Sequence, residues 1–122
     1  MSVALYGIPN CDQVKKARNW LSEHGIDVHF HDFKKAGISP ELVRPWLTQV
    51  DWNSLINRKG STWRNLPEHE QVLVQDELSA IHCMVHHPSV IKRPVLVVQD
   101  KKRTEIFVGF SEENYHRLFD AE

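Results

Sequence analysis

Residues 3–21, VALYGIPNCDQVKKARNWL, decide the fold that we expect for this chain. The run at residues 3–6 is typical of a short buried strand, and a turn that contains glycine and proline ends it. Over residues 11–24 the apolar side chains recur at helical spacing, and Gly25 follows as a natural helix terminus. The stretch therefore predicts a strand, a loop and a helix, with Cys11 at the start of the helix.

Alternating strand and helix patterns continue after Gly25. Residues 26–33, IDVHFHDF, place apolar side chains at every second position, which predicts a strand with one buried face. A second helix is expected to begin at Ser39 as its N-cap, with Pro40 at the first helical position. Pro45 lies in the second turn and is expected to weaken or bend that helix.

Residues 51–87 read as a helical insertion. Residues 51–64 favour a turn or short helix followed by a loop around Gly60, and Pro67 opens further helical sequence. One apolar stripe is expected on the last helix of this region, made of Leu78, Ile81, His82 and Val85.

The end of the chain predicts a hairpin and a helix. Strands are expected at residues 95–98 and 105–108, with the turn QDKKR between them, and a last helix begins at Ser111. We therefore expect an α/β thioredoxin-like fold: a four-stranded mixed sheet flanked by helices, with a helical insertion before the last strands. The chain is interpreted as one domain over residues 1–122, with its core at 1–36 and 88–122 and the insert at about 37–87.

Composition excludes several classes of function. The chain has 122 residues, with 15 basic and 16 acidic side chains and a net charge of −1, so we expect no direct nucleic-acid partner. No apolar run approaches the roughly 20 residues of a membrane span, and we expect no membrane partner and no signal peptide. Two cysteines do not make a disulfide framework, so a reducing, cytoplasmic location is expected.

Cys11 is the candidate nucleophile. At a helix N-terminus its sulfur lies near unpaired backbone N–H groups, and the helix dipole favours an anion there by roughly 0.3–1 kcal/mol. Lys15, one turn further, supports a thiolate, whereas Asp12 opposes it. The alternative interpretation is a small apolar side chain packed under the sheet.

Other candidate groups have weaker signals. Cys83 either resolves a disulfide of Cys11 or, as is commoner, packs in or on its helix. His82 and His86 have a spacing that metal sites use, with His87 beside them, but a tetrahedral site needs further ligands. We therefore expect no metal site.

Three arginines are considered as anion ligands, because guanidinium groups suit oxyanions and carboxylates. Arg58 and Arg64 lie in the tryptophan-rich loop, and Arg93 directly precedes Pro94 at the start of a buried strand. A solvated surface position is the default for each. Sequence alone favours a trans bond before Pro94, because only about 5–6% of such bonds are cis in folded proteins.

Taken together, three segments resemble the arsenate reductase/Spx-like (ArsC) family, and the resemblance spans nearly the whole chain. They are YGIPNCDQVKKA at residues 6–17, INRKGSTWR at 56–64, and IKRPVLV with EIFVGFSEE between residues 91 and 113. The sequence looks most similar to the uncharacterised Spx-type branch found in many bacteria. The resemblance implies a thioredoxin-like fold and a cis-proline at Pro94.

The resemblance also implies a set of site residues. Cys11 matches the reactive cysteine of the family, and Arg58 and Arg93 match two oxyanion-binding arginines. Asn10, next to the cysteine, and Lys15, one helical turn further, are added from their positions and, with Pro94, complete the expected site for glutathione or an oxyanion. Two departures matter: the third arginine of the reductases aligns with Gly109, and Val14 removes the Cys-x-x-Cys pair of many Spx regulators.

Three functions follow from the resemblance. The first is a glutathione-dependent thiol oxidoreductase, with no bound cofactor and glutathione as co-substrate. The second is an arsenate reductase that works with glutathione and glutaredoxin. The third is a regulator of the Spx type, which binds RNA polymerase and is not an enzyme.

Overall fold

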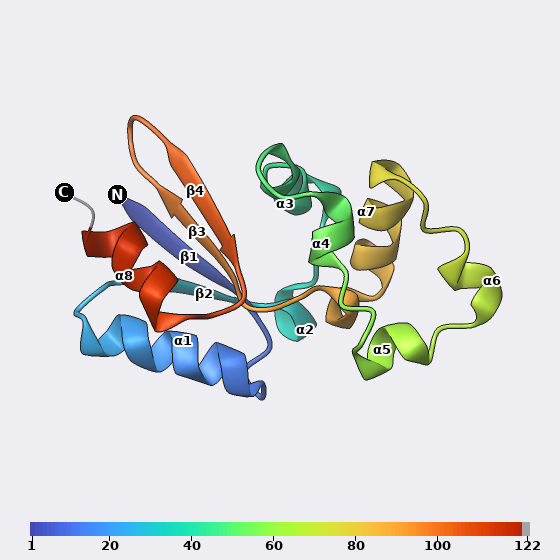
Figure 1. Cartoon of the computed structure of the whole chain (residues 1–122), viewed down its shortest axis with the longest axis horizontal. Helices are drawn as coiled ribbons and strands as arrows, with labels where there is room; N and C mark the ends of the chain where they lie inside the picture. Colours follow the sequence, from blue (N-terminus) through green and yellow to red (C-terminus); the bar gives the residue numbers. More distant parts are fainter. Residues whose placement is uncertain (121–122) are drawn as a thin grey trace. The chain divides into compact units, whose positions relative to one another are not determined.

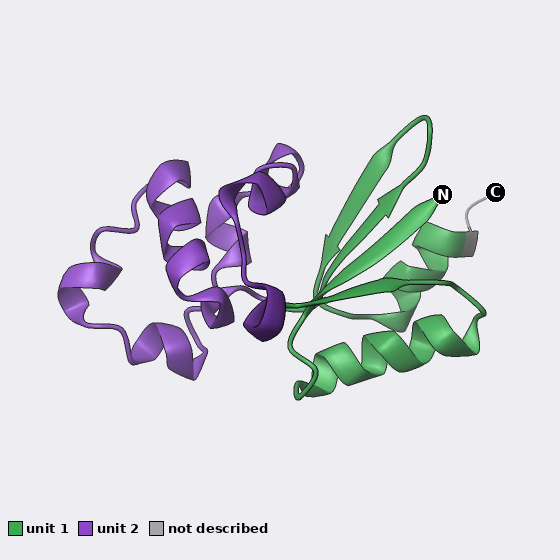
Figure 2. Cartoon of the chain, turned by 180° about the vertical axis from the view of Figure 1, so that it is seen from behind, with its two compact units in different colours: residues 1–32, 93–122 green, residues 33–92 purple. Residues whose placement is uncertain are grey.

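A four-stranded sheet organises one of the two compact units of the chain. The computed structural model describes residues 1–120. The sheet unit comprises Met1–Asp32 and Arg93–Glu122, and the helical unit comprises Phe33–Lys92 (Figure 2). The single domain with an insert at about residues 37–87 stays a prediction.

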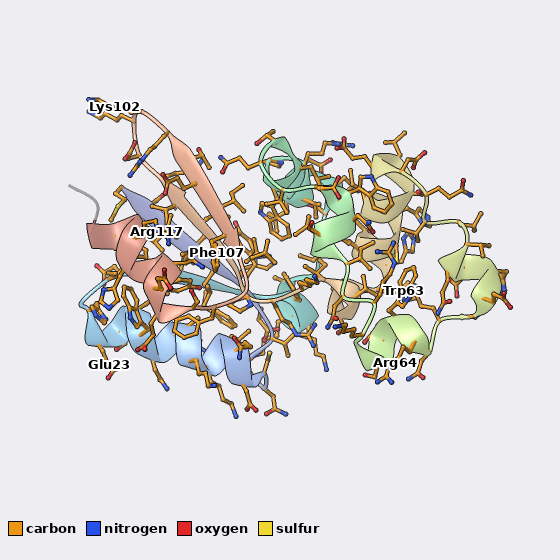
Figure 3. All side chains as sticks on the ribbon, viewed as in Figure 1. Glu23, Trp63, Arg64, Lys102, Phe107 and Arg117 are labelled. Carbon is orange, nitrogen blue, oxygen red and sulfur yellow. The ribbon has the colours of Figure 1, made fainter. Side chains whose placement is uncertain are left out.

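The sheet has the order β2-β1-β3-β4 (Figure 1). Its strands are β1 (Ser2–Gly7), β2 (His29–Asp32), β3 (Val95–Gln99) and β4 (Thr104–Val108). β1 pairs with β2 in parallel and with β3 antiparallel, and β3 and β4 form the antiparallel hairpin. Lys102 lies at the tip of that hairpin (Figure 3). The mixed sheet that the strand patterns predict is confirmed.

Two helices cover one face of the sheet. They are α1 (Asp12–Glu23) and α8 (Glu112–Asp120), and both lie on the same side of the strands (Figure 1). Tyr115 of α8 is fully buried, with its ring in edge-to-face contact with Trp20 of α1, the centroids 5.4 Å apart, and with Phe107 of β4, the centroids 6.0 Å apart. Aromatic contacts of this kind contribute about 0.5–1.5 kcal/mol beyond their buried area, so they fix how α8 packs on the sheet.

The helical unit consists of short elements. Its α-helices are α2 (Phe33–Ala36), α3 (Pro40–Val43), α4 (Trp52–Leu55), α5 (Ser61–Arg64), α6 (Glu68–Gln71) and α7 (Glu77–His86). Two 3₁₀ turns are η1 (Trp46–Thr48) and η2 (Pro88–Val90). Helices this short are not stable alone, so the unit depends on buried side chains, the largest of which are Trp46, Phe33, Leu55, Ile56, Met84 and Ile91. None of the helices in residues 1–120 has the length and apolar character of a membrane span.

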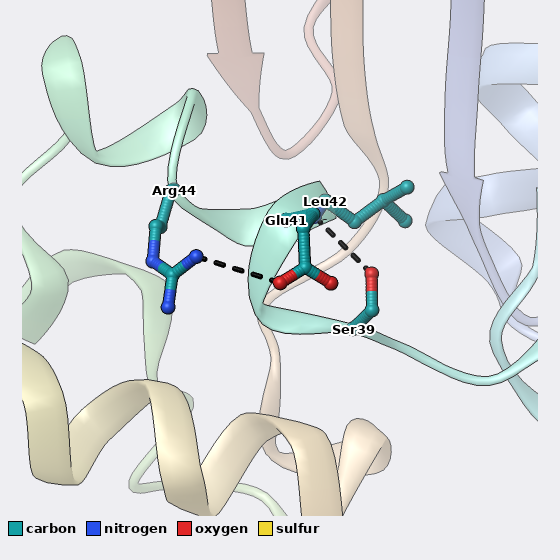
Figure 4. A network of polar contacts seen from close by, with 4 residues as sticks. All are labelled: Ser39, Glu41, Leu42 and Arg44. Atoms are coloured by element: carbon teal, nitrogen blue, oxygen red, sulfur yellow. Dashed lines mark hydrogen bonds and ion pairs between the residues drawn. The ribbon is translucent and has the colours of Figure 1, made fainter.

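The start of α3 agrees with its sequence signal. The Ser39 hydroxyl accepts a hydrogen bond of 3.3 Å from the Leu42 N–H, and an exposed ion pair of 3.5 Å joins Arg44 to Glu41 (Figure 4). The helix ends before Pro45, which has no N–H to continue the hydrogen-bond ladder. The expected weakening at Pro45 is confirmed as a break between α3 and η1.

The predicted apolar stripe on α7 is wrong for Leu78 and His82, whereas Ile81 is buried as expected. The buried residues of this helix are Ala80, Ile81, Cys83 and Met84. Leu78 is 74% exposed, and His82 is also exposed. The buried face of α7 is therefore rotated about the helix axis relative to the predicted face. Ala80 and Cys83 are small, so they contribute little to an apolar pattern in the sequence.

Candidate active site

Three segments of the sheet unit meet at one edge of the sheet. Tyr6 pairs with Val95, and Val95 pairs with Val108, so the ends of β1 and β4 lie beside the beginning of β3. We call this edge the site edge; its segments are residues 7–11, 93–94 and 109–111. Cys11, Arg93 and Pro94 therefore belong to neighbouring segments.

Cys11 is the N-cap residue of α1. Its backbone is extended, with φ −137° and ψ 127°, and its carbonyl accepts the first helical bond, 2.9 Å from the Lys15 N–H. The side chain is half-buried and makes no capping hydrogen bond. The sulfur thus lies at the end of the helix where unpaired N–H groups point outward, as the sequence predicted. Asn10 and Lys15 on either side are exposed.

Gly7 allows β1 and α1 to approach closely just before Cys11. A Cβ atom at residue 7 would lie 2.7 Å from Cγ2 of Val14, a side chain that is fully buried. The sequence analysis did not single out Gly7. The sequence did contain an indication of its role. Gly7 lies between a buried strand and a helix, and the first apolar residue of that helix must face the strand.

Arg93 and Pro94 lead into β3. The peptide bond between them is cis, as the family resemblance implied and as the sequence alone did not favour. Pro94 is buried, and its carbonyl accepts a hydrogen bond of 2.8 Å from the Gly109 N–H. Arg93 is half-buried. The segment is thus tied to the loop that follows β4.

The loop after β4 completes the site edge. Gly109 has a φ of +89°, a conformation that L side chains rarely adopt. Ser111 then caps α8, because its hydroxyl accepts a hydrogen bond of 3.0 Å from the Asn114 N–H. The backbone at residue 109, where the family resemblance implied the loss of an arginine, thus has a conformation that favours glycine.

Arg58 belongs to the helical unit. Its guanidinium donates a hydrogen bond to the Asn53 side chain and lies 5.1 Å from the ring centre of Trp63. Stacking and a hydrogen bond of this kind hold the side chain in place. Its predicted role as an anion ligand stays a prediction.

Cys83 lies in α7 of the helical unit and is buried. Burial raises the pKa of its thiol, and the negative charge of Glu70 raises it further. A thiol in this state is protonated at neutral pH and is a poor nucleophile. Of the two interpretations offered for Cys83, packing within its helix matches the structure.

The two cysteines are expected to react at different rates with iodoacetamide. At pH 7.5 we expect Cys83 to be alkylated about tenfold more slowly than Cys11, or slower still, because its thiol is protonated and only 7% of the residue is exposed. The rate at Cys83 should rise with pH, and Glu70→Gln should increase it at a given pH, because one cause of the raised pKa is removed. A time course read by peptide mass spectrometry measures both sites, and equal rates would contradict this expectation.

The histidines of α7 make contacts with one another and with Glu70. The rings of His82 and His86 are stacked with centres 4.1 Å apart, and His87 Nε2 lies 3.5 Å from the Glu70 carboxylate. Within residues 1–120, no group of three or more histidine, cysteine or acidic side chains is placed to hold a metal ion.

Comparison with solved structures gives the class of protein. The structure of a protein named YffB (PA3664) matches with a TM-score of 0.82 and 44% identity, over 93% of this chain and 96% of that one. The solution structure of an arsenate reductase (ArsC) related protein from Brucella melitensis matches with a TM-score of 0.69 and 48% identity, over 98% and 95%. Sheet order, cis-proline and N-capping cysteine define a thioredoxin-like protein.

Sequence comparison gives the family. The family model for ArsC matches residues 6–118. The chain belongs to the ArsC family. A curated relative, the global transcriptional regulator Spx of Lactiplantibacillus plantarum, is 29% identical over 118 residues, which cover 95% of this chain and 85% of that protein. The predicted resemblance is confirmed.

Proposed function

We propose that the protein is a glutathione-dependent thiol oxidoreductase in which the Cys11 thiolate is the nucleophile. One observation carries this proposal: the Cys11 side chain is half-buried at the N-terminus of α1, makes no capping bond, and belongs to the same sheet edge as Arg93 and Pro94. The thiolate is the reactive form of cysteine, and the N-terminus of a helix favours negative charge.

The reaction consists of two thiol–disulfide exchanges. In the first, the Cys11 thiolate attacks the glutathione sulfur of a mixed disulfide, a new S–S bond forms, and the substrate thiolate leaves. In the second, a glutathione thiolate attacks the Cys11–glutathione disulfide, releases oxidised glutathione and restores the Cys11 thiolate. The substrate is reduced by two electrons, two glutathione groups end in one disulfide, and the proton from the second glutathione passes to the substrate thiolate.

Glutathione is the proposed reductant because the chain offers no thiol suited to the second step. Position 14 is valine, and Cys83 is buried with a raised pKa. A thiol from solution must therefore resolve the mixed disulfide. Of the predicted site residues, Arg93 is at the site edge and is proposed to pair with a glutathione carboxylate, with Asn10, Lys15 and Pro94 around the same segments.

We expect Arg93→Ala to raise the KM for glutathione by about tenfold, as the loss of one charge-assisted hydrogen bond predicts. The kcat at saturating glutathione should change much less, because Arg93 does not touch the reacting sulfur atoms in this mechanism. Steady-state kinetics with a glutathionylated peptide, coupled through glutathione reductase to NADPH oxidation, give both constants.

The matched control for Arg93→Ala is Arg117→Ala. Arg117 is an exposed arginine of α8 whose guanidinium lies 3.3 Å from Glu113. An unchanged KM for Arg93→Ala, or an equal change in both variants, would remove Arg93 from the proposed site. Arg58→Ala belongs in the same series, because the family resemblance assigns it the same role.

Arsenate reduction is the second candidate, favoured by the likeness to an arsenate reductase related protein. In that reaction Cys11 attacks arsenate, and glutathione with glutaredoxin completes the cycle. Glycine at position 109 counts against it, because the third arginine that the resemblance implies is absent. Arsenate-dependent NADPH oxidation in the presence of glutathione, glutaredoxin and glutathione reductase is the test, and a rate equal to the blank would exclude it.

A regulatory role is the third candidate, favoured by a relative that is named a global transcriptional regulator. In this case the protein acts by binding RNA polymerase. Affinity capture on purified polymerase tests it directly, and the absence of a complex at micromolar concentrations would count against it.

A further inference from the structure

A cavity lies within the helical unit between α6 and α7. Its volume is about 570 Å³, within the roughly 300–1,000 Å³ that is usual for binding pockets. The residues that line it include Glu70 of α6, Leu73, and Ser79, Cys83 and His86 of α7. We call it the α6–α7 cavity. It contains neither Cys11 nor any other residue of the proposed glutathione site.

Large apolar side chains are exposed next in sequence to residues that line this cavity. Val72 is 59% exposed, Leu73 is 62% exposed and Leu78 is 74% exposed. Among residues 1–120, these three and Met1 are the exposed large hydrophobic side chains, and three of the four lie between the end of α6 and the first turn of α7. We call Val72, Leu73 and Leu78 the apolar rim. Apolar side chains gathered at a pocket mark a surface that binds a partner.

The segment of the chain that contains the lining residues is acidic. Residues 65–91 contain Glu68, Glu70, Asp76 and Glu77 but no lysine or arginine, which gives a charge of −4 with neutral imidazoles. The whole chain has 15 basic and 16 acidic residues, so the remainder has 15 and 12 and a surplus of three positive charges. The segment therefore repels nucleic acid and anionic lipid and attracts a basic partner.

We propose that the α6–α7 cavity and its apolar rim bind a basic amphipathic helix of a protein partner. One large apolar side chain of that helix enters the cavity, its neighbours on the same face cover Val72, Leu73 and Leu78, and lysine or arginine side chains face the four acidic residues. The inference is independent of the proposed glutathione chemistry.

A helix fits this surface better than an extended peptide or a small ligand. Residues 33–92 contain no strand, only an isolated bridge between Ile56 and Ile91, so the helical unit offers no free strand edge to pair with an extended backbone. A helix satisfies its own backbone hydrogen bonds and binds through apolar side chains at i, i+3, i+4 and i+7. A small ligand in the cavity would leave Val72 and Leu78 exposed, because neither lines it.

The test uses a synthetic helix and the full chain. The probe is a fluorescein-labelled amphipathic peptide of leucine and lysine, with leucine on one face, and its binding is followed by fluorescence anisotropy. Two matched peptides serve as controls: one has glutamate in place of lysine, and one has the same composition in an order without an apolar face. We expect only the first to bind, with a Kd in the micromolar range, and equal binding of the glutamate peptide would overturn the proposal.

Protein variants locate the binding site. Leu73→Ser and Leu78→Ser change exposed side chains, so the fold should survive, as circular dichroism will verify, and each should weaken binding by about tenfold. Glu77→Gln should weaken binding about twofold to threefold, whereas Glu23→Gln on α1 of the sheet unit should leave the Kd unchanged. Equal affinities across all variants would overturn the proposal. A concentration-dependent dimer in sedimentation velocity that Leu78→Ser abolishes would also overturn it, because the occupant would then be a second copy of this chain.

Discussion

Replacing Cys11 with serine is expected to reduce glutathione-dependent turnover to the blank rate. The hydroxyl of serine is far less acidic than a thiol and forms no disulfide, so neither exchange step can take place. Because Cys11 is half-buried and makes no capping hydrogen bond, the substitution should leave the fold and its stability nearly unchanged. The measurement is the coupled assay with a glutathionylated peptide, together with a denaturation curve.

Cys83→Ser is the matched control, because it removes the other cysteine of the chain. Its turnover should remain close to that of the wild type, although a buried serine will lower the stability. Undiminished turnover in Cys11→Ser would contradict the mechanism. A loss of turnover in Cys83→Ser, with the fold intact, would mean that Cys83 resolves the mixed disulfide. Mass spectrometry distinguishes these results, because the Cys11–glutathione adduct accumulates only if the second exchange step fails.

Gly7→Ala is expected to lower the free energy of unfolding by about 1–3 kcal/mol, the usual cost of inserting a methyl group into a packed site. The new Cβ would lie 2.7 Å from Val14 Cγ2, well inside the contact distance of two carbon atoms. Val14 is fully buried on α1, so relief requires α1 to move away from β1 or Val14 to leave its position. Movement of α1 displaces the helix N-terminus at which Cys11 lies, so we also expect slower alkylation of Cys11.

A double-mutant cycle with Val14→Ala tests the cause. Val14→Ala removes the two methyl groups that meet the new Cβ, so Gly7→Ala should cost much less stability in that background than in the wild type. Urea denaturation of the four proteins gives the coupling free energy. If Gly7→Ala costs the same in both backgrounds, steric contact with Val14 is not the reason that glycine is required at residue 7.

The sheet unit was predictable because each of its elements has a strong local signal. The alternation at residues 26–33 packs Ile26, Val28 and Phe30 against the core as expected, each of them partly buried, and Gly25 follows α1 with a φ of +68°. Tyr115 faces the core, as the spacing after Ser111 indicated. In these segments the apolar pattern, the caps and the turns all favour one structure.

The helical unit was less predictable because its elements are short. Four-residue helices such as α2 and α6 have too few residues to show a period, and neither was delimited from the sequence. The stripe assigned to α7 was wrong because Leu78 faces outward while Ala80 and Cys83 are buried. The same error concealed the apolar rim, since a leucine assumed to lie in the core is not considered as part of a binding surface.

The candidate site was predictable only in part. Cys11 follows from its place between a strand and a helix, whereas the cis bond before Pro94 required the family resemblance. The part played by the loop at residues 109–111 required the sheet register, which aligns Val95 with Val108. From a single sequence, the residues of such a site can be named. The strand pairing that brings their segments together cannot be determined from it.

The helical unit enters and leaves the sheet unit at the site edge. The chain departs after Asp32, which pairs with Gly7, and returns at Arg93, directly before Pro94. Both junctions are therefore at the ends of strands, and the segment between them can vary without a change in the register of the sheet. Residues 33–92 can therefore change in length or sequence while the strand pairing that positions Cys11 and Pro94 stays the same.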